Sequence, residues 1–189
     1  MSDAHTHLCA VAGGDHAAFT ALYRQQARAL TVLARGILGG DRAAAEDVVD
    51  ATFIAVWQGA GRYQGQSAGE AAGWLRRVLR NKAVDWLRAN ARYDTGLEAD
   101  HAQADTDPLS NPERAAMQRD AGERLAVAMR RLSVDQREAV MLCYFEDMAL
   151  ADIARIARCP EGTVKTRLFH ARKALRGYLQ DGDWADSAH

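Results

Sequence analysis

The stretch Cys159-Pro160-Glu161-Gly162-Thr163-Val164-Lys165-Thr166-Arg167-Leu168, with Asp152-Ile153-Ala154 shortly before it, decides the fold of the C-terminal part of the chain. A short apolar helix, a tight turn and a second helix rich in Lys and Arg predict a helix-turn-helix, whose second helix enters the major groove of DNA. Val164 and Leu168, four residues apart, are expected to face inward. The alternative is an ordinary surface helix that happens to be basic. The candidates for DNA contact are Thr163, Lys165, Thr166, Arg167, His170 and Lys173.

Charge is unevenly distributed, although the formal net charge of the 189 residues is only −1. The segments from Trp74 to Arg92 and from Arg155 to Arg176 are basic, and Tyr93 to Glu113 between them is acidic without Lys or Arg. Two separate basic segments predict two electrostatic contacts with nucleic acid. The low net charge therefore does not exclude a nucleic-acid partner.

Composition favours a helical protein, because prolines number only three and aromatic residues make up 7% of the chain. No apolar run approaches the roughly 20 residues of a membrane span. The N-terminus lacks the basic start and the apolar stretch of a signal peptide, which predicts a cytoplasmic protein. Cys9, Cys143 and Cys159 are odd in number and widely spaced, which argues against a disulfide framework.

Capping residues predict where several helices begin. An Asp before an apolar helical pattern, or a Ser three residues before Glu or Gln, can bind the free N–H groups of a first turn. The glycine-rich segment 59–69 is expected to be a loop, followed by a long helix that ends near Arg92. The predicted starts are Asp15, Asp41, Ser67 with Glu70, Ser133 with Gln136, and Asn111-Pro112.

These patterns predict an all-α chain with two small helical domains. The first domain is expected to span residues 1–92 and the second, which contains the helix-turn-helix, residues 112–189. The segment 93–111 is acidic, poor in large apolar residues and without periodicity. It is therefore expected to be a flexible linker.

The predicted helix after Asp41 combines acidic and aromatic side chains. Its residues Asp47, Asp50, Phe53 and Trp57 follow one another at intervals of three or four, so that a carboxylate edge adjoins an aromatic edge. An aromatic anchor beside charged contacts is typical of a protein–protein hot spot. The alternatives are that the two aromatic residues belong to the core and that the two carboxylates form a solvated face.

The first basic segment has the composition of a surface for unpaired DNA. Its cations can neutralise phosphates, and aromatic rings can stack on bases. Trp74 and Trp86 are expected mainly in the core, and Asp85 is expected to pair with an Arg one turn away. The candidates for DNA contact on an outward stripe are Arg77, Arg80, Asn81 and Arg88.

Three blocks of this sequence together resemble bacterial sigma factors of the extracytoplasmic-function (ECF) type. The blocks are Ala45 to Trp57, Trp74-Leu75 with Arg80 to Arg88, and Asp152 to Leu168, and the resemblance covers roughly residues 15–92 and 112–179. It implies that the first block, with Asp47, Asp50, Phe53 and Trp57, binds the β′ clamp helices of core RNA polymerase. It implies that the second block reads and melts the −10 promoter element, together with the preceding loop that contains Arg62 and Gln64. The third block is implied to read the −35 element.

The resemblance thus implies an alternative sigma factor, with core RNA polymerase, promoter DNA and an anti-sigma factor as partners. The chain departs from the family at Asp50 and Asp152, where Gln and Glu are usual. It also has Arg158 in the turn of the helix-turn-helix, where the family has Gly. That position commonly takes a left-handed conformation, which costs a residue with a side chain about 1 kcal/mol.

Other functions have weaker support. A stand-alone transcriptional regulator would share the helix-turn-helix, but it would need neither of the first two blocks. The sequence holds no catalytic triad, glycine-rich phosphate loop or paired acid and base, so we expect no enzymatic activity and no cofactor. The pattern of His5, His7, Cys9 and His16 lacks a second cysteine pair, so no metal site is predicted there. These residues are expected in an untethered N-terminal tail.

Overall fold

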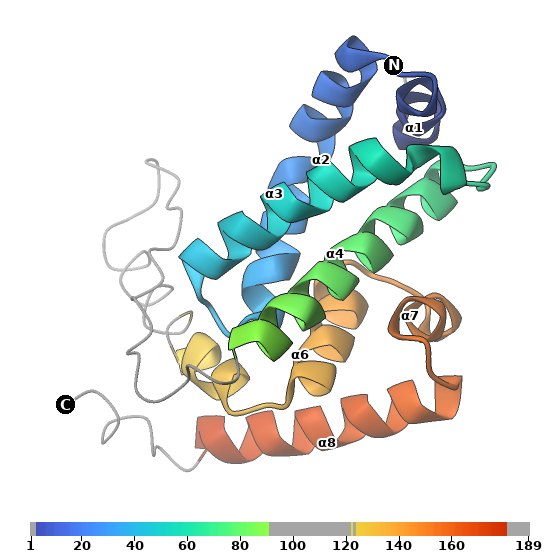
Figure 1. The fold of residues 1–189 in the computed structure, drawn as a ribbon. Coiled ribbons are helices and arrows are strands. Elements are labelled where there is room, and N and C mark those ends of the chain that lie inside the picture. The colour runs from blue at the N-terminus through green and yellow to red at the C-terminus, as the bar shows by residue number, and fades with distance from the viewer. Residues whose placement is uncertain (1–2, 91–121, 123, 181–189) are drawn as a thin grey trace, which may run out of the picture.

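The computed structural model describes residues 3–90, 122 and 124–180, and the regular structure within these ranges is helical (Figure 1). The prediction of an all-α chain is therefore confirmed. The predicted linker and the predicted helix start at Asn111-Pro112 lie outside the described residues. The elements are α1 (Ala4–Ala12), α2 (His16–Ile37), α3 (Arg42–Gly59), the 3₁₀ turn η1 (Ala60–Arg62), α4 (Ala68–Asn90), α6 (Val134–Val140), the π-helical turn η2 (Met141–Phe145), α7 (Leu150–Ala157) and α8 (Glu161–Gln180). Residues 124–130 are also helical.

The predicted caps are present where the structure describes them. The Asp15 carboxylate accepts hydrogen bonds from the N–H groups of Ala17 and Ala18 at 2.8 and 3.0 Å, and Asp41 caps α3 in the same way. Ser133 and Gln136 form a complete capping box at the start of α6. Each cap satisfies N–H groups that the first turn of a helix leaves free, which fixes these starts.

The N-terminal residues form a packed helix, so the prediction of an untethered tail is wrong. Asp3 caps α1 by accepting a hydrogen bond from the N–H of Thr6 at 2.9 Å. Ala4, Leu8 and Val11 lie at helical spacing and are buried, and Leu8 is fully inaccessible. Their burial against α2 and α4 outweighs the tendency of a chain end to fray.

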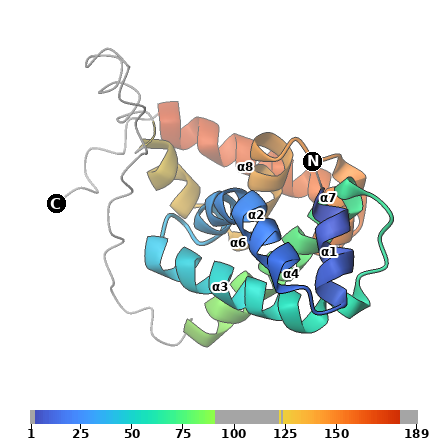
Figure 2. The same ribbon diagram turned by 90° about the horizontal axis from the view of Figure 1, so that it is seen from above.

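Helices α1 to α4 form the N-terminal half, in which α2 and α3 cross one face of α4 (Figures 1 and 2). The cluster around Leu8 includes Leu22, Val56 and Leu75, which are all inaccessible to solvent. Gly39 and Gly40 end the turn after α2 with φ of 73° and 96°, a conformation that glycine adopts without strain.

The two predicted helical domains are present as an N-terminal and a C-terminal half, and the C-terminal half packs directly against the N-terminal half. Figure 1 shows α6 and α7 between α4 and the long helix α8, and α6 also contacts α2. One apolar cluster contains Ile37 and Leu38 from the first half and Met129, Met141 and Leu142 from the second. The two halves therefore share a continuous core in this structure.

The helix-turn-helix is formed by α7 and α8 as predicted. Ile153 and Ile156 of α7 are buried with Val164 and Leu168 of α8, which confirms the inward face of the second helix. Arg158 ends α7 with φ of 52° and ψ of 46°. The turn thus takes the left-handed conformation expected from the family pattern, with Arg in place of Gly.

Candidate polymerase and DNA interfaces

The acidic and aromatic residues of α3 lie on different sides of the helix. Asp47 and Asp50 are exposed, whereas Phe53 is 3% exposed and packs against Phe19 and Tyr23. Trp57 is half-buried. Phe53 is therefore a core residue that packs α3 against α2. This agrees with the alternative, left open by the sequence, that the aromatic residues of this helix belong to the core.

The apolar side chain that accompanies the two carboxylates on the surface is Ile54. It is 59% exposed and follows Asp47 by seven residues and Asp50 by four, so that the three residues share one face of α3. Sequence reasoning missed Ile54 because it gave the apolar role to the aromatic residues. The helical spacing itself was sufficient to find it.

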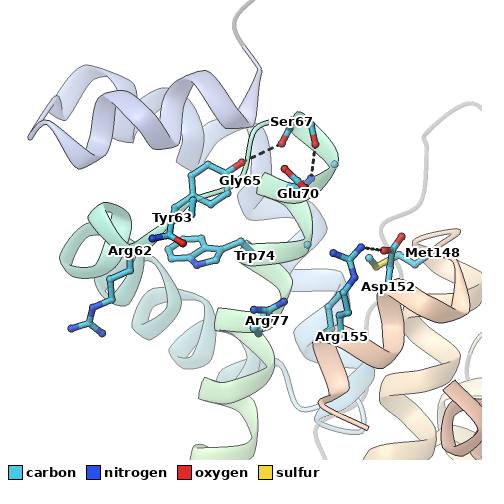
Figure 3. A pocket seen from close by; sticks show the side chains of 14 residues that line it. Arg62, Tyr63, Gly65, Ser67, Glu70, Trp74, Arg77, Met148, Asp152 and Arg155 are labelled. Atoms are coloured by element: carbon cyan, nitrogen blue, oxygen red, sulfur yellow. Dashed lines mark hydrogen bonds and ion pairs between the residues drawn. The ribbon is translucent and has the colours of Figure 1, made fainter. Parts of the chain in front are cut away.

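The loop after α3 is held by Tyr63. Its hydroxyl donates a hydrogen bond to the Ser67 carbonyl at 3.2 Å and lies 3.0 Å from Nδ1 of His5, while its ring meets Trp74 edge-on at 5.8 Å (Figure 3). A side chain at position 65 would displace the Tyr63 ring, so the glycine leaves room for the ring in this position. Burial, with the charge of Glu70, raises the pKa of Tyr63, so the hydroxyl remains a neutral donor.

This loop and α4 form one wall of a pocket of about 590 Å³ (Figure 3). Arg62 and Gln64 are exposed, and Tyr63 and Trp74 supply aromatic surface. Nε of Arg77 is buried without a hydrogen-bond partner. The opposite wall comes from α7 and the segment just before it, with Met148, Asp152, Arg155 and Ile156. A cavity with aromatic and guanidinium groups suits an unstacked base and its phosphate.

The predicted outward stripe of α4 is only partly exposed. Arg88 is exposed and lies near Asp85, at 4.0 Å, as the spacing predicted. Asn81 and Arg77 are half-buried. Arg80 instead points to the C-terminal half, where Nε lies 3.2 Å from Oε1 of Glu138, and its side chain is 19% exposed. The expectation of an outward stripe is therefore wrong for Arg80, because its side chain pairs with Glu138 of α6.

The exposed face of α8 is polar and basic with one aromatic residue in its centre. Lys165, Thr166, His170 and Lys173 are exposed, and Phe169 between them is 58% exposed. Sequence reasoning missed Phe169, although its spacing of three and four residues from its neighbours places it on that face. Thr163, the remaining candidate on the first turn, is half-buried.

The two cations near the start of α8 have different surroundings. Lys165 is 61% exposed and forms an ion pair with Glu161 at 3.0 Å within the same helix. Arg167 is 20% exposed, forms an ion pair with Asp135 of α6 at 2.6 Å and has Nη1 3.6 Å from Sγ of Cys159. Lys165 is therefore available to solvent and DNA, whereas Arg167 is held against α6 and the turn.

The N-terminal histidines His5 and His16 contact aromatic side chains. His5 contacts Tyr63 and Cys9, and the ring of His16 stacks on Trp57 at 4.5 Å. In the described part of the chain no group of three or more His, Cys, Asp or Glu side chains is arranged to hold a metal ion. Among the helices of residues 3–90 and 124–180, none is long and apolar enough to cross a membrane.

Two models of protein families match the chain. The model of sigma-70 region 2 matches residues 22–93, which include the α3 face, the Tyr63 loop and α4. The model of sigma-70 region 4 matches residues 122–175, which include the helix-turn-helix. The two matched regions therefore contain the candidate polymerase and −10 surfaces in the N-terminal half and the candidate −35 surface in the C-terminal half.

Individual relatives extend over nearly the whole chain. The RNA polymerase sigma-H factor of Pseudomonas aeruginosa is 32% identical over 88% of this chain and 89% of its own length. The ECF RNA polymerase sigma-E factor of Escherichia coli is 29% identical over the same shares. A solved structure of the sigma factor RpoE in complex with the anti-sigma factor NepR from Bartonella quintana is similar in fold, with a TM-score of 0.69 and 25% identity over 86% of this chain and 96% of that one. The family models and the Pseudomonas relative together establish that the chain belongs to the ECF-type sigma factors of bacterial RNA polymerase.

Proposed function

We propose that this sigma factor binds core RNA polymerase through α3, captures the −10 element with the Tyr63 loop and α4, and reads the −35 element with α8. One observation supports this division best. Three surfaces of distinct chemistry lie on different parts of the fold: an acidic and apolar face on α3, an aromatic and basic pocket beside α4, and a polar face of α8 with exposed cations. Each surface suits one of the three partners that promoter recognition requires.

The polymerase contact is assigned to Asp47, Asp50 and Ile54. Their exposure and common face give a carboxylate pair beside an apolar anchor, which can be desolvated against a helical, basic partner such as the β′ clamp helices. Phe53 holds α3 on the core, and the half-buried Trp57 borders the contact. In this assignment Phe53 does not contact the polymerase but holds α3 in the position that exposes Asp47, Asp50 and Ile54.

The −10 contact is assigned to the pocket beside Tyr63. A base that leaves the stack can lie against Trp74, while Arg62 and Gln64 reach its edge or its phosphate from the loop. The unpartnered Nε of Arg77 is a donor for the strand. Arg80, Asn81 and Arg88 then neutralise phosphates along α4, and Arg80 does so once it leaves Glu138.

The −35 contact is assigned to the exposed face of α8. Lys165 and Lys173 bind phosphates, and Thr163, Thr166, Phe169 and His170 meet base edges in the major groove. The Thr166 hydroxyl donates to the Gly162 carbonyl at 3.0 Å, so its lone pairs are left to accept from a base. Arg167 can join this surface only by releasing Asp135.

The place of action and the inhibitor follow from the family. Core polymerase and promoters are in the bacterial cytoplasm, so we place the protein there, as an initiation factor without a catalytic centre of its own. The relative from Bartonella quintana was solved in complex with an anti-sigma factor. We infer that a partner of this class also regulates the present chain.

The test is binding to core polymerase followed by transcription. Purified chain should be retained by immobilised core enzyme, and the resulting holoenzyme should transcribe from a subset of a promoter library that core enzyme alone does not use. The Asp47→Asn and Ile54→Asp double variant should lose retention while keeping its melting temperature. A wild-type chain that is folded and fails to bind core enzyme would contradict the proposal.

A further inference from the structure

The C-terminal half lies on the surface that we assign to the −10 element. The pocket beside Tyr63 and Trp74 is closed on its other side by α7, where Asp152 and Arg155 form an ion pair (Figure 3). A single strand that entered this pocket from α4 would therefore meet α7. In this arrangement the pocket has two walls, and only one of them belongs to the −10 surface.

Two carboxylates of the C-terminal half form ion pairs with arginines of α4. Arg76 forms an ion pair with Glu146, which follows η2, and Arg80 forms one with Glu138 of α6. The four side chains are only 2–19% exposed, so these pairs are sheltered from water. Arg76, Arg77 and Arg80 lie on one side of α4, where promoter phosphates would need cations. Glu138 and Glu146 are thus the anionic partners of two of these three cations.

The remaining contacts between the halves are close and specific. Gly36 of α2 lies so near Met141 that any side chain at position 36 would collide with the methionine side chain. Arg137 of α6, which is 9% exposed, donates hydrogen bonds to the carbonyl of Ile37 at 2.8 Å and to two carbonyls of its own half. These contacts fix the C-terminal half in the position that brings Glu138 and Glu146 to α4.

We propose that the C-terminal half masks the −10 surface in the free protein, with Glu138 and Glu146 standing in for DNA phosphates on Arg80 and Arg76. The occupant of the α4 surface is a segment of the same chain, and single-stranded DNA competes with it. This inference rests on the proposed assignment of α4 to the −10 element. Its consequence is that the halves must separate before the pocket accepts a base.

The first test separates the halves without a change of charge. Gly36→Leu introduces a side chain that must displace the buried side chain of Met141 from the contact between the halves, and Leu favours the helical state of α2 more than Gly does. The radius of gyration from small-angle X-ray scattering should increase. Affinity for a fluorescent single-stranded oligonucleotide pool should rise, and the slope of log K against log salt should steepen by about 1.4, because about 0.7 is expected for each of two phosphates. Gly59→Leu is the matched control, because a side chain there meets open space.

The second test uses the charges. Glu146→Arg should repel Arg76 and open the molecule, and so should Arg76→Glu, whereas the double variant with both changes should be as compact as the wild type. Glu46→Arg makes the same charge change on α3, outside the contact between the halves, and corrects for the effect of added positive charge on DNA binding. Circular dichroism confirms that each variant is folded.

The outcomes distinguish this inference from the proposed function. Variants that open but bind the oligonucleotides no more tightly than wild type would overturn masking, and so would folded Gly36→Leu and Glu146→Arg chains that stay compact. These measurements use the chain without polymerase. Retention by core enzyme, measured in parallel on the wild type, tests the sigma-factor assignment independently. If one variant fails to fold, the other still decides whether the halves separate.

Discussion

Replacement of Lys165 by Ala is expected to weaken DNA binding through the loss of one phosphate contact. The side chain is 61% exposed on the first turns of α8, so its removal creates no cavity. One phosphate contact on duplex DNA changes the slope of log K against log salt by about 0.9, which corresponds to about eightfold in affinity, or about 1.2 kcal/mol, at 0.1 M salt. Lys165 must leave Glu161 to bind the phosphate, and an exposed pair one helical turn apart contributes about 0.3–0.5 kcal/mol. The net loss is therefore about 0.8 kcal/mol, or about fourfold.

Replacement of the neighbouring carboxylate, Glu161, should raise the affinity for DNA. Glu161→Gln frees Lys165 from its ion pair, so affinity should rise about twofold, which equals the contribution of the exposed pair. The assay is fluorescence anisotropy with a labelled duplex across a salt series, using the full chain. Arg42→Ala is a suitable control, because Arg42 is the exposed cation of a similarly spaced pair with Glu46 on α3. If Lys165→Ala leaves both affinity and salt slope at their wild-type values, α8 does not meet DNA along this face.

Four further changes test other parts of the molecule. Ile54→Asp should weaken retention by core polymerase about 5- to 30-fold in a pull-down titration, because the apolar centre of a hot spot contributes about 1–2 kcal/mol, whereas Val32→Asp on α2 should not. Leu8→Ala should lower the free energy of unfolding by about 2–5 kcal/mol in urea, because the side chain is fully buried; a loss below 1 kcal/mol would mean that α1 is not part of the core. Arg158→Gly should raise that free energy by about 1 kcal/mol, since φ of 52° is strained for Arg, and an unchanged value would contradict the strain. Burial raises the pKa of Glu138 above its usual 4.5, so its contribution to stability is greatest at acid pH and is lost as pH rises through the raised pKa. Glu138→Gln should remove this part of the pH dependence of the free energy of unfolding. If the free energies of unfolding of the variant and the wild type change with pH in parallel, Glu138 makes no such contribution.

The local features of the fold were predictable because short sequence patterns determine them. Asp15, Asp41 and Ser133 begin helices through bonds to N–H groups two or three residues away, so the pattern and the interaction lie in the same few residues. The left-handed Arg158 was expected from the comparison of one turn position with the family pattern. Helix α1 was missed because its apolar face is short, with Ala4, Leu8 and Val11 only.

The sequence predicted which helices carry the candidate sites better than it predicted which of their side chains are exposed. Helical spacing placed Asp47 and Asp50 on the surface of α3, but the depth of Phe53 depends on the packing of α2, which no local pattern reveals. The same limit applies to Arg167, whose partner Asp135 lies 32 residues away along the chain. Exposure of Ile54 and Phe169 follows from spacing once the buried faces of α3 and α8 are known.

The contacts between the halves were the least predictable, and their chemistry suits a reversible association. Glu146 and Arg76 are 70 residues apart in the sequence, and each looks like an ordinary surface charge there. A sheltered ion pair adds little net stability compared with apolar residues of the same volume, because both charges must give up water, but it strongly disfavours arrangements that leave either charge buried alone. Such a pair fixes one position of the halves without holding them irreversibly. When the halves separate, Arg76 and Arg80 return to water or bind phosphate, both of which satisfy their charge. Apolar residues at these positions would hold the halves together more tightly and would leave α4 without cations for the promoter strand, so the use of charges here is consistent with one surface that serves two partners in turn.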